Sequence, residues 1–122
     1  MKITESMENY LETILVLSKK LPVVRSVDIA EELDFKKSSV SVAVKKLKES
    51  NQITVTKEGY IYLTDSGLEI AETIWERHKL ISAWLISLGV DEKIAREDAC
   101  RMEHVISAES FSAIKSYVAD KN

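Results

Sequence analysis

The chain has 122 residues, enough for one ordinary domain or a small domain with an appendage, and its 45% hydrophobic content suffices for a core. Three glycines and one proline leave little room for irregular loops. The 30% charged content also fits a helix-rich protein. We expect no membrane span, because no run of about 18 apolar residues occurs. The first residues lack the apolar core of a signal peptide and a single cysteine excludes an intrachain disulfide, so we expect a cytoplasmic protein.

The net charge of −3 is unevenly spread along the chain. Residues 1–60 carry 10 Lys and Arg against 9 Asp and Glu, whereas residues 61–122 carry 7 against 11. A local basic surface can bind DNA while an acidic body keeps the protein in solution. The lysines that cluster in the first half are Lys36, Lys37, Lys45, Lys46, Lys48 and Lys57.

Apolar residues at helical spacing predict three helices in the first half. The first begins at Ser6, which we expect to cap it, and ends before Pro22. The second covers residues 27–33 with Ser26 as its cap, and the third follows a cap at Ser38 and ends near residue 50. Two short helices joined by a tight turn form a helix-turn-helix unit.

A hairpin is predicted directly after these helices. Residues 53–56 are β-branched throughout, residues 60–63 are aromatic or aliphatic, and a short loop with Gly59 separates them. Asp34-Phe35 takes the place of the usual glycine in the turn between the second and third helices. The order helix, helix, helix, hairpin is typical of a winged helix, and the alternative is a small α+β domain with no role in DNA binding.

The second half is predicted to be helical throughout. A long helix covers about 64–88, starts with Thr64 as its cap and ends at Gly89. A further helix covers 91–106, and the last begins at Ser107. We therefore expect a mainly α fold with a small β-hairpin, comprising a winged helix-turn-helix domain at 1–63 and a helical domain at 64–122.

Three apolar residues near the end of the long helix, Trp84, Leu85 and Leu88, suggest a dimer face. A domain of this size could hardly bury all of them alone. The alternative is that they belong to a larger intramolecular core.

Cys100, Glu103 and His104 share one face of the predicted helix 91–106, because positions i, i+3 and i+4 lie on the same side. A thiolate, a carboxylate and an imidazole are good ligands for a divalent transition metal. Taken alone, a buried cysteine beside surface charges explains the same pattern equally well.

A series of short motifs occurs in a specific order and spacing. They are Met7–Ile14, Asp28-Ile29-Ala30, Ser38-Ser39-Val40, Leu63-Thr64 with Gly67, Arg77-His78, and Cys100-x-x-Glu103-His104. Together they resemble the diphtheria toxin repressor / manganese transport regulator family of metal-activated bacterial transcription repressors. The resemblance implies a winged-helix DNA-binding domain followed by a metal-binding and dimerisation domain, in a two-domain form without the SH3-like domain of longer members.

The resemblance also implies a regulatory metal site and its ligands. The matching positions are Asn9, Glu12, His78, Cys100, Glu103 and His104. Asn9 departs from the family pattern, which has Asp or Met there, and an amide oxygen is a weaker, uncharged ligand. Cys100 resembles the iron-type members, whereas manganese-type members carry Glu. We therefore expect Fe(II) first and Mn(II) second, with Zn(II), Co(II) or Ni(II) able to substitute.

The same interpretation assigns the DNA contacts. We expect a homodimer on palindromic operator DNA, with the start of the third helix at base edges and the lysines at phosphates. The expected contacts are Lys36, Lys37, Ser38, Ser39, Ser41, Val42, Lys45 and Lys46, with Lys57 on the wing.

Three other functions stay open at this point. A metal-independent winged-helix regulator could use Trp75 and Trp84 to line a small-molecule pocket. A winged helix could serve protein–protein contacts only, and Cys100 could be a redox sensor. Catalysis is not expected, because no nucleophile, general base and orienting group occur together with a cleft-forming segment.

Overall fold

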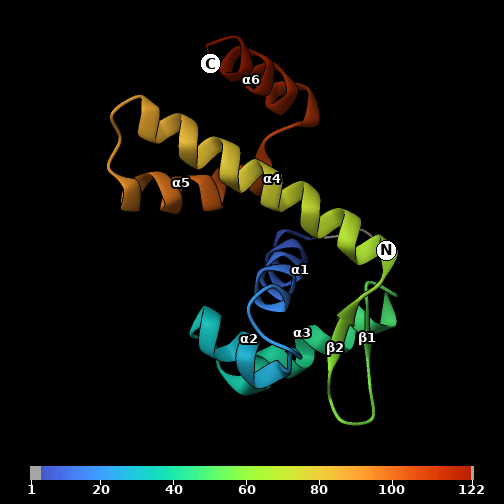
Figure 1. Cartoon of the computed structure of the whole chain (residues 1–122). Coiled ribbons are helices and arrows are strands. Elements are labelled where there is room, and N and C mark those ends of the chain that lie inside the picture. Colours follow the sequence, from blue (N-terminus) through green and yellow to red (C-terminus); the bar gives the residue numbers. More distant parts are fainter. Residues whose placement is uncertain (1–3, 122) are drawn as a thin grey trace. The chain divides into compact units, whose positions relative to one another are not determined.

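The computed structural model describes residues 4–121, and the chain divides into two compact units, 1–72 and 73–122 (Figure 1). Residues 1–3, on which the expectation about a signal peptide partly rests, lie outside the described range. The described residues form six helices and one two-stranded antiparallel sheet, which confirms the predicted mainly α fold with a hairpin. No helix in this range combines the length and apolar character needed to cross a membrane.

The elements follow the predicted order, with boundaries that differ by one or two residues. They are α1 (Glu5–Ser18), α2 (Ser26–Leu33), α3 (Lys37–Glu49), β1 (Ile53–Val55), β2 (Ile61–Leu63), α4 (Asp65–Ser87), α5 (Glu92–Val105) and α6 (Ala108–Lys121).

The predicted caps of the first three helices are wrong by one or two positions. Thr4, not Ser6, caps α1: its backbone is extended and its hydroxyl accepts the N–H of Met7 at 3.2 Å. At α2 the N-cap is Arg25, not Ser26, and its backbone N–H donates to the carboxylate of Asp28 at 2.9 Å. Lys36 is the N-cap of α3, and the helix begins before Ser38.

The turn between α2 and α3 lacks glycine, as predicted, and Asp34 takes the left-handed conformation instead, with φ of 56°. Asp and Asn tolerate this region better than other non-glycine residues. The N–H of Phe35 then donates to the carbonyl of Ala30 at 3.0 Å, which closes the end of α2.

The hairpin pairs Ile53 with Leu63 and is one residue shorter at each inner end than predicted. The hydroxyl of Thr56 accepts the N–H of Tyr60 at 3.0 Å, so the turn begins at Thr56 and leaves both residues outside the strands. The N–H of Ile61 also donates to the carbonyl of Val24 at 2.8 Å, which ties β2 to the segment before α2.

The core of the first unit forms where α1 packs against α2, α3 and β2, and where α3 packs against β1. Its buried apolar residues lie on the inner faces of these elements, at the spacing that predicted the helices. They are Tyr10, Leu11, Ile14, Leu15, Leu17, Val24, Ile29, Ala30, Val40, Val44, Leu47, Ile53 and Ile61.

The start of α4 is held tightly against the loop that precedes the hairpin. Thr64 caps α4 as predicted: its hydroxyl accepts the N–H of Gly67 at 3.1 Å and donates to the carbonyl of Asn51 at 2.8 Å. Gly67 is buried, and a Cβ at this position would overlap the carbonyl oxygen of Gln52. The site therefore accepts glycine alone.

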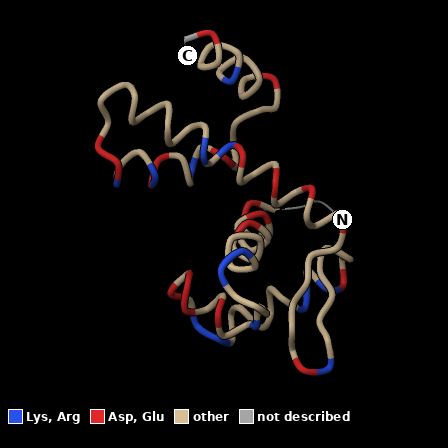
Figure 2. Tube along the Cα trace, viewed as in Figure 1, with Lys and Arg blue, Asp and Glu red and all other residues tan. Residues whose placement is uncertain are grey.

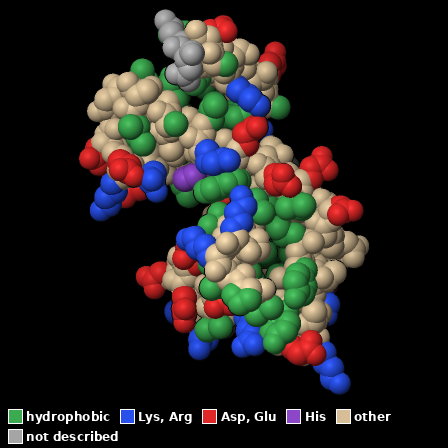
Figure 3. All heavy atoms as spheres, viewed as in Figure 1, with side chains coloured by type: hydrophobic (Ala, Val, Ile, Leu, Met, Phe, Trp, Pro, Cys, Tyr) green, Lys and Arg blue, Asp and Glu red, His purple; other side chains and the backbone are tan. Residues whose placement is uncertain are grey.

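The second unit has a smaller core, formed by Ile81, Ala99 and Phe111 with Leu80, Leu85, Met102 and Ile106 packed around them. Gly89, with φ of +100°, follows α4 as predicted. Leu85 is half-buried and packs against this core. Leu88 is 64% exposed, and Figure 3 shows other hydrophobic side chains at the surface of this unit.

We predict that Gly67→Ala lowers the free energy of unfolding by about 2–3 kcal/mol, because the added methyl group displaces backbone and not a flexible side chain. Urea unfolding followed by circular dichroism measures the change. Glu72→Ala, on the exposed side of α4, is the matched control and should stay within about 0.5 kcal/mol of the wild type. Equal stability of the two variants would contradict the close contact.

Candidate metal centre and nucleic-acid interface

A buried carboxylate lies between two imidazoles in the second unit. Glu103, on α5, is fully buried, and its Oε2 lies 3.0 Å from Nδ1 of His78 on α4. Its other oxygen, Oε1, lies 3.3 Å from Nε2 of His104, whose side chain is 3% exposed. The cluster therefore joins α4 and α5 through side chains that are all metal ligands in other proteins.

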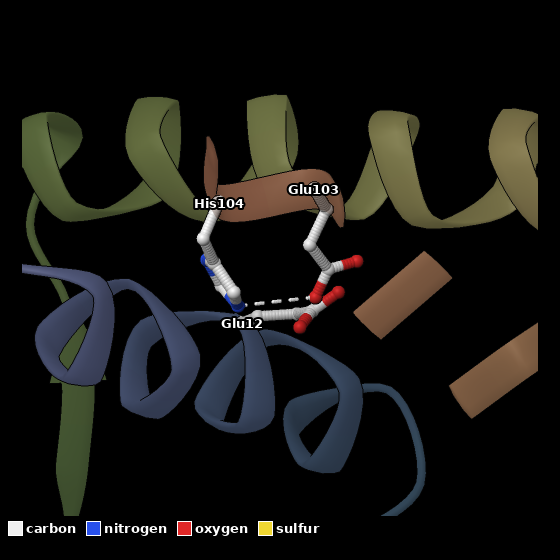
Figure 4. A group of neighbouring side chains, drawn as sticks. All are labelled: Glu12, Glu103 and His104. Atoms are coloured by element: carbon white, nitrogen blue, oxygen red, sulfur yellow. Dashed lines mark ion pairs between the residues drawn. The ribbon is translucent and has the colours of Figure 1, made fainter. Parts of the chain in front are cut away.

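The helical spacing explains how α5 supplies two of these groups. Asp91 caps the helix by accepting the N–H of Lys93 at 3.2 Å, and the buried residues Ala95, Ala99 and Glu103 then follow at intervals of four. Glu103 thus occupies a position on the face that the core covers. Figure 4 shows its side chain beside that of His104, with the ion pair dashed.

The donor chemistry of the cluster fits a divalent transition metal. Imidazole nitrogen suits Fe, Co, Ni and Zn, and carboxylate oxygen suits Mn and Fe as well. A set of two imidazoles and one carboxylate can therefore bind any of these metals. A histidine that binds a metal commonly has a carboxylate on its other nitrogen, which fixes the ring. The same contacts exist here between His78 and Glu103.

The remaining predicted ligands are Asn9 and Glu12 on α1 and Cys100 on α5. Cys100, one turn before Glu103, is exposed and forms no disulfide. Glu12, drawn on α1 in Figure 4, is buried, and Asn9 is half-buried on the same helix of the first unit. Within the second unit the structure therefore brings together His78, Glu103 and His104, and places the thiol at the surface.

Trp75 was not predicted as part of the metal site, although it lies one turn before His78 on α4. Its ring stacks on the His78 ring with centroids 5.6 Å apart and planes 12° apart. The ammonium of Lys79 lies 5.6 Å from the centre of the indole. The spacing i, i+3 was the available signal in the sequence. An indole so close to a metal ligand is a natural fluorescent reporter of that ligand.

The outer face of α3 carries the residues predicted to contact DNA. Val40, Val44 and Leu47 are buried in the core, most residues between them are exposed, and Val42 is 56% exposed although it is apolar. The exposed predicted residues on this helix and its cap are Lys36, Lys37, Ser38, Ser39, Ser41, Val42, Lys45 and Lys46. A helix with small side chains between lysines at its start and lysines further along can approach a groove closely and contact phosphates.

The hairpin supplies a second basic position. Lys57 is exposed in the turn between β1 and β2, next to Glu58, and Figure 2 shows the two opposite charges at the tip. Arg25 was missed by the sequence analysis: it packs on the ring of Tyr60 at 5.0 Å and donates to its hydroxyl at 3.3 Å. This contact holds the residue before β2 against the start of α2.

Two family models together match nearly the whole chain. Residues 2–61 match the N-terminal DNA binding domain of the iron dependent repressor, and residues 64–121 match its metal binding and dimerisation domain. The first match contains α1 to β1 and ends at the first residue of β2, and the second contains the His78–Glu103–His104 cluster.

Relatives and solved structures agree with this assignment. The chain is 34% identical over 117 residues to an uncharacterised HTH-type transcriptional regulator of Methanocaldococcus jannaschii, covering 94% of each chain. It is 32% identical over 113 residues to the transcriptional regulator MntR of Escherichia coli O6:H1, covering 93% of this chain and 73% of the relative.

A manganese-dependent transcriptional repressor solved in complex with manganese superposes with a TM-score of 0.85 at 25% identity over 93% of this chain, which spans about half of that protein, 52%. The agreement extends over both the DNA-binding and the metal-binding parts of the sequence. The chain therefore belongs to the iron-dependent repressor family of metal-dependent transcriptional regulators, which are not enzymes.

Proposed function

We propose that this protein is a cytoplasmic repressor that binds palindromic operator DNA as a homodimer when a divalent metal is bound, with Fe(II) preferred to Mn(II). The observation that carries the proposal is the buried Glu103 carboxylate between His78 and His104, in the part of the chain that matches a metal-binding domain. We assign DNA binding to residues 1–63, and metal binding and dimerisation to 64–122. The boundaries of the two family models, at 61 and 64, support this division.

The proposed ligands come from both parts of the chain: Asn9, Glu12, His78, Cys100, Glu103 and His104. Glu12 is a carboxylate among the buried residues of α1, which supports a specific role for its charge. When bound, the metal supplies positive charge that offsets the thiolate and carboxylates and holds them in one geometry. The thiolate is the reason to prefer Fe(II) to Mn(II), because soft sulfur suits the later metals better.

Shared ligands would make DNA binding depend on the metal. Asn9 and Glu12 precede the helix-turn-helix, whereas the other four residues belong to the dimerisation domain. A two-fold dimer binds both half-sites only when its two α3 helices match the groove spacing of about 34 Å or a multiple of it. The metal favours the conformation with that spacing if it binds this conformation more tightly. By reciprocity, operator DNA then tightens metal binding.

The DNA contacts are proposed for the exposed face of α3 and the hairpin. Ser38, Ser39, Ser41 and Val42 would reach base edges, and the lysines around them would contact phosphates. Short side chains offer few hydrogen bonds to bases, so the shape of the DNA would contribute to specificity.

A gel shift with a genomic fragment library under anaerobic conditions tests the function. We expect retardation by the wild type with Fe(II), weaker retardation with Mn(II), and none with chelator. His78→Ala with Cys100→Ala should abolish the response, because both substitutions remove proposed ligands. Glu97→Ala with Arg101→Ala, both exposed on α5, is the matched control and should behave like the wild type. Equal retardation with chelator would contradict the proposal and favour a metal-independent winged-helix regulator.

A second experiment uses the contact between Trp75 and His78. The chain has two tryptophans, so Trp84→Phe leaves Trp75 as the only indole. We expect Co(II) to quench its emission, because the indole lies 5.6 Å from the proposed ligand. Glu103→Gln, which keeps the size but removes the charge, should weaken Co(II) binding at least about tenfold. Glu97→Gln is the exposed control, and the same midpoint in both variants would exclude Glu103 as a ligand.

The salt dependence of DNA binding tests the phosphate contacts. Each of Lys45→Ala and Lys46→Ala should reduce the slope of log K against log salt concentration by about one, because one fewer counterion is released. Lys93→Ala, at an exposed position in the dimerisation domain, should leave the slope unchanged. Fluorescence anisotropy with a labelled duplex between 50 and 300 mM salt, roughly the range in which such slopes are measured, gives the value. An unchanged slope in both α3 variants would place the DNA elsewhere.

A further inference from the structure

Arg77 holds the end of α5 from a neighbouring helix. It precedes His78 on α4, and its Nη1 donates to the carbonyl oxygen of Glu103 at 3.1 Å and to that of Ile106 at 2.9 Å. Its guanidinium carbon lies 5.6 Å from the centre of the Phe111 ring, on α6. One side chain of α4 therefore contacts the last turn of α5, the link after it, and the first turns of α6.

These contacts satisfy a need that α5 cannot meet by itself. The last carbonyls of a helix lack partners within the helix, and the helix dipole leaves this end negative. The one basic residue in the last turn of α5 is His104, which is engaged with Glu103. Arg77 supplies both the donors and the positive charge.

Glu103 is consequently held at both ends by consecutive residues of α4. His78 contacts its carboxylate, and Arg77 contacts its backbone carbonyl. A shift of the Glu103 backbone would therefore move the carboxylate as well. The position of a proposed metal ligand depends on a residue that offers no metal-binding atom.

Arg77 is not fully paired at this place. Its Nε is buried and has no hydrogen-bond partner among the described residues. An apolar residue of similar size would avoid the cost of that unpaired atom but would leave the carbonyls of Glu103 and Ile106 without this donor. Nη1 alone reaches both carbonyls while the guanidinium also lies against the Phe111 ring, and a lysine ammonium offers donors but no planar group for that ring contact.

We propose that Arg77 is a positioning residue that couples metal binding at Glu103 to the start of α6, through the carbonyls of Glu103 and Ile106 and through the Phe111 ring. The inference rests on the proposed metal site. It adds that α6 responds to metal, and that the response passes through Arg77. Metal that fixes the Glu103 side chain also fixes its carbonyl, and Arg77 then holds the Ile106 link and Phe111 in one arrangement.

The test combines metal affinity with hydrogen exchange in the full-length protein. In the wild type, Co(II) should slow amide exchange in the first turns of α6, around Phe111. Arg77→Lys should weaken Co(II) binding about tenfold and, at saturating Co(II), should abolish the added protection in α6. Arg101→Lys, exposed on α5, is the matched control and should preserve both.

A purely structural role for Arg77 predicts a different result. In that case Arg77→Lys lowers the melting temperature of the metal-free protein but keeps the Co(II) affinity and the metal-induced protection, and this outcome overturns the proposal. Phe111→Leu is the second variant and serves if Arg77→Lys does not fold. Phe111→Leu should keep the Co(II) affinity but lose the Co(II)-induced protection of α6. Full Co(II)-induced protection of α6 in this variant would overturn the coupling. Failure of Co(II) to bind the wild type at all would reject the metal site itself.

Discussion

The burial of the Glu103 carboxylate constrains the rest of the second unit. A charged carboxylate without partners inside a protein costs several kcal/mol, so it must be paired wherever the chain places it. The chain contains two histidines, and both contact this one carboxylate. The packing of α4 against α5 therefore has to keep these rings in register with Glu103. At His78, Glu103 and His104 a metal would exchange existing polar contacts for coordination bonds, so these three side chains would need little further ordering.

The first unit is organised by a different principle, the satisfaction of backbone groups at the ends of short elements. Thr4, Asp28 and Thr64 each cap a helix with a side-chain oxygen, and Asp34 replaces glycine in the helix-turn-helix. These local bonds allow α3 to turn its apolar residues inward and leave its serines and lysines exposed. No polar side chain of α3 is required by the core, which leaves its outer face available for recognition.

Periodicity predicted the order of the elements and the common face of Glu103 and His104, because both depend on spacing within one helix. His78 lies 25 residues from Glu103, and only the family resemblance connected the two. Ser6 is the better cap than Thr4 by residue type, so the choice of Thr4 depends on where the chain enters the helix. Arg77 belongs to the Arg77-His78 motif, but its role gave no signal in the sequence, since its partners are backbone carbonyls that every residue possesses. The proposed preference for Fe(II) over Mn(II) depends on whether the exposed Cys100 thiol binds the metal, which sequence patterns do not encode.

The contact between Gly67 and Gln52 has a consequence for the comparison of related sequences. The restriction at this position arises from the backbone of the loop before the hairpin, and involves neither the exposed face of α3 nor the histidine cluster. Selection on this glycine is therefore independent of selection on ligand or operator preference. A descendant that lost its histidines and changed its effector would still need it. The Leu63-Thr64 motif with Gly67 thus records common architecture, and the agreement of two sequences there is no measure of whether they respond to the same signal.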